Sequence, residues 1–122
     1  MKLFLDTSFF YFILTEGNTE AKEIFTGKTA KISNEYAMKE LKRTLSHHGH
    51  NSHGVEDFIK DIRLKVIILP MPSKERKNTV EISDKSDWPI LVGAKENDAV
   101  LVTFDHKLAR EARKYVKTIL LE

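Results

Sequence analysis

The sequence contains no cysteine among its 122 residues. Disulfide bonds, thiolate zinc sites and cysteine nucleophiles are therefore excluded. Long apolar runs are also missing, since none approaches the roughly 20 residues that a membrane-spanning helix needs. A polar Asp-Thr-Ser segment at residues 6–8 interrupts the apolar stretch of residues 3–14, and no small-residue cleavage site follows it. We therefore expect neither a membrane span nor a signal peptide, and a cytoplasmic location is the default.

Internal repeats and low-complexity tracts are absent as well. With 41% hydrophobic and 31% charged residues, the composition is that of a folded chain with one buried core. We therefore expect one domain over residues 1–122. Twenty basic and eighteen acidic residues give a net charge of +2, which neither requires nor excludes nucleic acid as a partner. Local basic clusters suit a phosphate backbone, but solvated helix faces explain each cluster equally well.

The hydrophobic pattern predicts strands and helices in alternation. Apolar runs predict strands at residues 2–5, 30–33, 66–69, 99–104 and 117–121. Helical spacing and capping residues predict helices at residues 9–14, 19–25, 35–47, 55–62, 73–82, 86–95 and 106–114. Thr7 or Ser8 is expected to cap the first helix and Asn34 the third. The unbroken aliphatic run at residues 66–69 indicates a strand buried on both faces.

Strands that alternate with helices imply right-handed crossovers and a mainly parallel sheet that is covered on both sides. We therefore expect an α/β fold, specifically a three-layer α/β/α sandwich with roughly five strands. In such folds, ligands bind beyond the carboxyl ends of the strands, where the strand order reverses. Polar residues near these strand ends are therefore the first candidates for a site.

Four acidic residues from four separate segments lie near the expected edge. Asp6 directly follows the first strand, and Asp105 directly follows the strand at residues 99–104. Glu40 lies in the helix after the second strand, and Asp87 lies in the first turn of the helix before the strand at residues 99–104. Unpaired carboxylates about 4 Å apart repel by around 4 kcal/mol at an effective dielectric constant of 20. A divalent ion such as Mg²⁺ removes that repulsion and suits phosphoryl chemistry.

Each of these acids also has an ordinary structural interpretation. Asp6, Asp87 and Asp105 lie near helix starts, where a carboxylate caps the helix or interacts favourably with its dipole. Glu40 is flanked by lysines, as many surface residues are. For each acid taken singly the structural interpretation is favoured, and only their convergence favours a metal site.

The segments that carry these acids resemble motifs of the PIN-domain nucleases, in order along nearly the whole chain. LFLDTS at residues 3–8 looks like the family's first strand and first acid. ISN at residues 32–34 and ELK at residues 40–42 resemble the second strand and the glutamate helix. DKSDWPIL at residues 84–91 and VLVTFDHKL at residues 100–108 are similar to the segments of the third and fourth acids.

The resemblance implies an Mg²⁺- or Mn²⁺-dependent endoribonuclease, such as the toxin of a toxin–antitoxin pair. It also implies RNA as substrate, an antitoxin protein as partner and a homodimer. The catalytic metal ligands it implies are Asp6, Glu40, Asp87 and Asp105. Residues expected to support these ligands are Thr7, Ser8, Asp84 and Thr103, and the expected RNA contacts are Lys42, Arg43 and Lys107.

Two features depart from or blur the family pattern. Phe104 stands where the family commonly has glycine. Asp84 competes with Asp87 for the role of third acid, and Glu35 competes weakly with Glu40. We favour Asp87 because its spacing to the following helix fits better.

Two other functions remain open at this point. One is a non-catalytic PIN-fold RNA-binding or interaction module, and the other is a phosphoacceptor receiver domain, which ranks lower because Asp6 stands alone after the first strand. Histidines at positions 47, 48, 50 and 53 suggest zinc, but such a glycine-containing stretch more often forms an exposed turn. The aromatic residues at 9–12 and Trp88 could stack on bases, although core or dimer contacts are commoner for them.

Overall fold

The computed structural model describes residues 1–122 and contains a five-stranded sheet in which all neighbouring strands are parallel. The strands are β1 (Lys2–Leu5), β2 (Ala30–Asn34), β3 (Ile67–Leu69), β4 (Val100–Thr103) and β5 (Thr118–Leu120). Their order across the sheet is β3-β2-β1-β4-β5. The chain therefore adds β2 and β3 on one side of β1, and then β4 and β5 on its other side.

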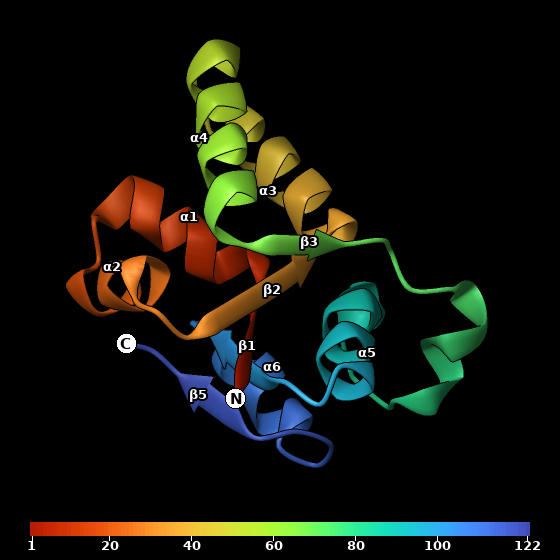
Figure 1. Cartoon of the computed structure of the whole chain (residues 1–122). Coiled ribbons are helices and arrows are strands. Elements are labelled where there is room, and N and C mark those ends of the chain that lie inside the picture. Colours follow the sequence, from red (N-terminus) through yellow and green to blue (C-terminus); the bar gives the residue numbers. More distant parts are fainter.

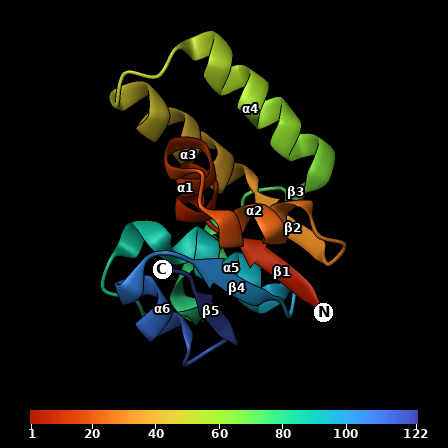
Figure 2. The same ribbon diagram turned by 90° about the vertical axis from the view of Figure 1, so that its left-hand side faces the viewer.

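Helices cover both faces of this sheet (Figure 1). One face carries α1 (Thr7–Glu16), α2 (Thr19–Thr26), α3 (Glu35–His47) and α4 (Ser52–Lys65), and the other carries α5 (Trp88–Glu96) and α6 (His106–Ala112). Figure 2 shows the same separation from the side, with α3 and α4 forming a long antiparallel pair. The predicted three-layer α/β/α arrangement is confirmed. No helix is both long enough and apolar enough to cross a bilayer.

The core is a cluster of 29 buried residues that fills the space on both sides of β1. Phe4 on β1 faces α5, because a Cβ atom at Gly93 of that helix would lie only 2.7 Å from Phe4 Cε2. Leu3 and Leu5 alternate with Phe4 along the strand and so face the opposite layer. Residues 88–94 of α5 are all buried, which explains why this helix has no polar face.

Three sequence predictions need correction. Residues 73–82 are not one helix: a 3₁₀ segment, η1 (Lys74–Thr79), is followed by extended chain, because residues 73–79 are all exposed and have no apolar stripe to bury. β3 is not buried on both faces, since it is an edge strand with Ile67 64% exposed. The histidine-rich loop is shorter than predicted, because His47 ends α3 and His53 lies in α4.

Candidate functional site

The acidic residues meet beyond the carboxyl ends of β1 and β4, which are neighbours in the sheet. Asp6 follows β1 and Asp105 follows Thr103 at the end of β4, and the register pairs Leu5 with Val102. The strand order reverses between these two strands. This is the position at which parallel α/β sheets bind ligands.

Asp6 is 4% exposed and accepts three hydrogen bonds. Its Oδ1 accepts from Ser8 Oγ at 2.7 Å and from Phe9 N at 3.0 Å, and its Oδ2 accepts from Thr103 Oγ1 at 2.6 Å. The Phe9 bond makes Asp6 the cap of α1, so the prediction that Thr7 or Ser8 caps this helix is wrong. Burial raises the pKa of Asp6 from 3.8 to about 6, although the three hydrogen bonds oppose the rise.

Thr103 and Ser8 hold the two strand ends together. Thr103 Oγ1 accepts from the Asp105 backbone N–H at 3.0 Å while it donates to Asp6. Ser8 Oγ accepts from Phe104 N at 3.0 Å. The two hydroxyls therefore fix the carboxylate of Asp6 relative to the turn that carries Asp105.

Glu40 is held from α1 and from its own helix. Its Oε1 accepts from Thr7 Oγ1 at 2.7 Å, and its Oε2 accepts from the Tyr36 hydroxyl at 3.1 Å. Burial, followed by the charge of Glu40, raises the pKa of Tyr36 to about 12, which keeps this hydroxyl a donor. Sequence reasoning missed Tyr36, although its spacing of four residues from Glu40 places both on one helix face. The Arg43 guanidinium lies 4.0 Å from Glu40 Oε2.

Asp87 precedes α5 and makes no capping hydrogen bond. Burial raises the pKa of its carboxyl from 3.8 to about 7, and four negative charges add to the rise: Asp84, Glu40, Asp105 and Asp6. The structure therefore brings all four predicted acids into electrostatic range of one another. Asp84 instead caps a short 3₁₀ turn, η2 (Lys85–Asp87), where bonds from Ser86 lower its pKa.

Asp105 is the most exposed of the four acids. Its Oδ1 accepts from the backbone N–H groups of Lys107 and Leu108, both at 3.0 Å, and so caps α6. Its Oδ2 accepts no hydrogen bond from the protein and faces solvent. A small cavity is lined by Asp105 together with Asp84, Asp87 and the side chain of Lys107.

One buried side chain connects the helices of Glu40 and Asp87. Asn34, at the end of β2, caps α3 as predicted, with its Oδ1 accepting from Ala37 N at 3.1 Å. Its Nδ2 donates to Pro89 O in the first turn of α5 at 3.0 Å. The start of α3 and the start of α5 are thereby held at a fixed separation.

The predicted RNA-contacting cations divide into two groups. Lys42 forms an exposed salt bridge with Glu56 of α4. Arg43 lies beside Glu40, and Lys107 lines the acidic cavity. Two of the three predicted cations therefore flank the acids.

The donor set consists only of carboxylate and hydroxyl oxygens, which suits Mg²⁺ or Mn²⁺ and does not suit softer metals. As placed, no three acidic or histidine side chains are close enough together to hold one metal ion. The histidines at positions 47, 48, 50 and 53 are likewise not grouped closely enough, as placed, to hold one metal ion.

Most of the aromatic residues near the chain start belong to the core. Phe9 and Phe10 are fully buried, so neither is available to stack on a base. Phe12 packs against Phe104 with ring centroids 4.8 Å apart, which explains how Phe104 is accommodated where the PIN family commonly has glycine. Trp88 is 8% exposed.

By sequence, the chain matches no family model and no curated protein. By structure, it is similar to VapBC2 from Rickettsia felis bound to a DNA fragment from their promoter, at a TM-score of 0.77 and 15% identity over 100% of both chains. It is also similar to FitAcB from Neisseria gonorrhoeae (0.72, 15%, 96% of both chains). A third similar structure is VapC20 from Mycobacterium tuberculosis, a sarcin-ricin loop cleaving toxin (0.69, 15%, 88% of this chain and 93% of that one). The chain therefore has the PIN-domain fold that its motifs resemble.

Proposed function

We propose that this chain is an endoribonuclease that hydrolyses RNA phosphodiester bonds with Mg²⁺ or Mn²⁺, and that it acts as the toxin of a toxin–antitoxin pair. The observation that carries the proposal is the convergence of four carboxylates from four segments on one edge of the sheet. Burial, followed by the negative charges around it, raises the pKa of Asp87 to about 7. A divalent ion relieves this repulsion and stabilises the charged forms. The shared fold with a toxin that cleaves the sarcin-ricin loop supports the substrate class.

In this proposal Asp6, Glu40, Asp87 and Asp105 hold the metal. When bound, the metal would supply an activated water and neutralise charge on the scissile phosphate. Hydrogen bonds from Ser8 and Thr103 orient the carboxylate of Asp6. Hydrogen bonds from Thr7 and Tyr36 orient that of Glu40. Both carboxylates are therefore oriented before substrate arrives.

Two cations are suited to guide the RNA backbone. Lys107 lies on the Asp105 side of the acids, and Arg43 lies on the Glu40 side. Positive charge on either side of an acidic centre attracts phosphates while the acids themselves attract the metal. Lys42 forms an exposed ion pair with Glu56, and its contact with RNA stays a prediction.

We extend the proposal to the partners. The similarity to VapBC2 and to a toxin supports an antitoxin protein as the binding partner of this chain. A homodimer and a cytoplasmic location are further predictions, of which the homodimer is tested by measuring the mass of the purified protein in solution.

The decisive experiment is cleavage of labelled RNA with Mg²⁺, with Mn²⁺ and with a chelator. Metal-dependent cleavage that is lost in Asp6→Asn and in Asp105→Asn supports the proposal. Asp57→Asn is the matched control, because Asp57 is an exposed aspartate on α4 with a side chain 61% exposed. Equal cleavage by wild type and both site variants identifies a contaminant. RNA retention without cleavage under any metal indicates the non-catalytic binding module instead.

A further inference from the structure

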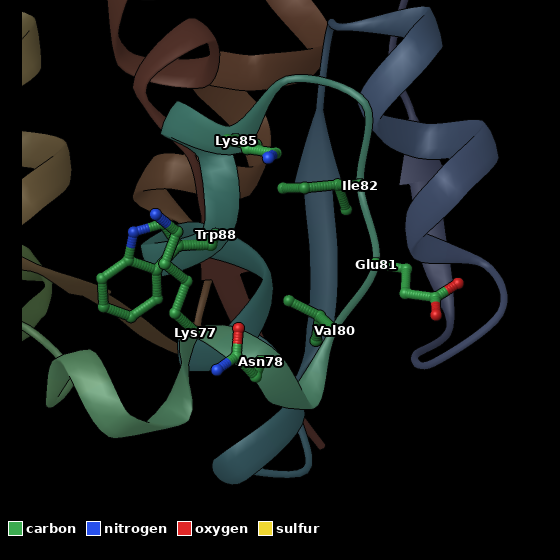
Figure 3. Close-up of a pocket in the computed structure, with 7 residues that line it drawn as sticks. All are labelled: Lys77, Asn78, Val80, Glu81, Ile82, Lys85 and Trp88. Carbon is green, nitrogen blue, oxygen red and sulfur yellow. The ribbon is translucent and has the colours of Figure 1, made fainter.

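A second hollow lies directly beside the acidic cavity. It lies between η1, the extended chain after it, and the first turn of α5 (Figure 3). The residues that line it are Lys77, Asn78, Val80, Glu81, Ile82, Lys85 and Trp88. Ile82 lines both this pocket and the acidic cavity, so the two share a wall. Trp88 also follows Asp87 in the sequence.

The irregular chain that forms one wall is held in place at alternate residues. Three side chains bind its backbone: Lys95 Nζ donates to Thr79 O at 3.0 Å, the Tyr115 hydroxyl accepts from Glu81 N at 2.8 Å, and Glu111 Oε2 accepts from Ser83 N at 2.7 Å. These anchors come from α5, from α6 and from the turn that follows α6. Although the wall is neither helix nor strand, the pocket is therefore formed before a ligand binds.

The pocket combines three kinds of surface. Val80 and Ile82 point toward the side of Trp88, while Glu81 points away from them (Figure 3). Asn78, at the opposite end of the pocket from Lys85 in this view, offers both an amide donor and an amide acceptor. Apolar walls suit the faces of a nucleobase, an amide suits its polar edge, and lysines suit the phosphates attached to it.

We propose that this pocket binds one unpaired base of an RNA strand whose neighbouring phosphate lies at the acidic cavity. This inference rests on the proposed function, since it assigns the substrate of the same site. A free anion would gain no favourable contact from the apolar walls, and an apolar ligand would leave Asn78 and two lysines without partners. The pocket therefore selects single-stranded RNA, because a paired and stacked base cannot enter it.

Trp88 provides a direct measurement, since it is the only tryptophan in the chain. Short RNA oligonucleotides of a single base type are titrated in chelator, which prevents metal-dependent cleavage, and the fluorescence of Trp88 is recorded. Oligonucleotides of the same length with abasic sugars are the control, because they keep the phosphates and lack the bases. We expect the base-containing strands to change the fluorescence and to bind about tenfold more tightly, which corresponds to about 1.4 kcal/mol.

Two variants test the walls. Asn78→Ala and Lys77→Ala are expected to weaken binding of the base-containing strands about tenfold and severalfold, respectively. Lys74→Ala is the matched control, because Lys74 is an exposed lysine of η1 that does not line the pocket. Circular dichroism establishes that each variant is folded.

The possible failures are distinguishable. If abasic and base-containing strands bind equally, if Trp88 does not respond, or if Asn78→Ala behaves like Lys74→Ala, the base pocket is refuted even where metal-dependent cleavage is observed. If the fluorescence depends on the bases but no cleavage occurs with any metal, the nuclease fails and the pocket stands. Absence of RNA binding in chelator refutes the pocket, and absence of both binding and cleavage with Mg²⁺ or Mn²⁺ refutes the nuclease as well.

Discussion

Removing the charge of Asp6 is expected to stabilise the protein at neutral to alkaline pH when no divalent metal is present. The carboxyl is buried, and its pKa is raised from 3.8 to about 6. This difference corresponds to about 3 kcal/mol between the protonated and ionised forms. Asp6→Asn reproduces the neutral form in size and shape, and its amide is able to donate to the Thr103 hydroxyl, which now donates to the carboxylate.

The sign of the pH dependence follows from the direction of the shift. A carboxyl whose pKa is raised in the folded chain binds more protons there than in the unfolded chain. Its contribution to stability is fully present below pH 3.8 and is lost as the pH rises through about 6. Asp87, with a pKa raised to about 7, acts in the same direction. The free energy of unfolding of the wild type in chelator therefore falls as the pH rises from 3.8 to about 7.

Urea unfolding followed by circular dichroism measures this fall. We expect Asp6→Asn to flatten the pH dependence and to exceed the wild type at pH 8 by up to about 3 kcal/mol. Mn²⁺ at about 100 times its dissociation constant should stabilise the wild type by about 2.7 kcal/mol and leave Asp6→Asn nearly unchanged. Asp57→Asn, on the exposed surface of α4, should behave as the wild type. A lower stability of Asp6→Asn at pH 8 in chelator would refute the reasoning.

Three further predictions concern stability. Gly93→Ala should destabilise the fold by about 1–3 kcal/mol, because the new Cβ lies 2.7 Å from Phe4 Cε2; an unchanged melting temperature contradicts this close contact. Arg63→Ala should cost less than about 1 kcal/mol in urea unfolding, because its ion pair with Glu35 is exposed; a larger loss would assign it a structural role. Asp98→Gly should raise the free energy of unfolding by up to about 1 kcal/mol, and with it the melting temperature, because Asp98 has a φ of 49°. A lower melting temperature contradicts strain at this residue.

The elements that position the acids could be predicted because local chemistry determines them. Short aliphatic runs predict β1 and β4, and the acids that follow them necessarily reach the carboxyl edge of a parallel sheet. Asn34 was correctly predicted as a cap, since its side chain competes for exposed helix N–H groups. For Asp6 and Asp105, capping and participation in the acidic cluster are compatible, because each caps a helix with Oδ1.

The parts that could not be predicted depend on contacts between distant segments. The chain at residues 79–83 is held by side chains from α5 to residue 115, and no local pattern encodes such anchors. The ion pair of Lys42 with Glu56, 14 positions later in the sequence on the neighbouring helix, could not be predicted either. Tyr36 was missed because an aromatic residue on an amphipathic helix is usually part of the core.

The central place of β1 has a consequence for how the protein is synthesised. β1 is translated before β4, with which it pairs, and Asp6 receives its shortest hydrogen bond from Thr103, 97 residues later. The acids of residues 6 and 105 can therefore meet only after residue 105 has left the ribosome. Until then, a nascent chain holds Asp6 without Thr103 and Asp105. If the chain is the nuclease that we propose, it cannot cleave RNA before residue 105 has left the ribosome, because its site is incomplete until then.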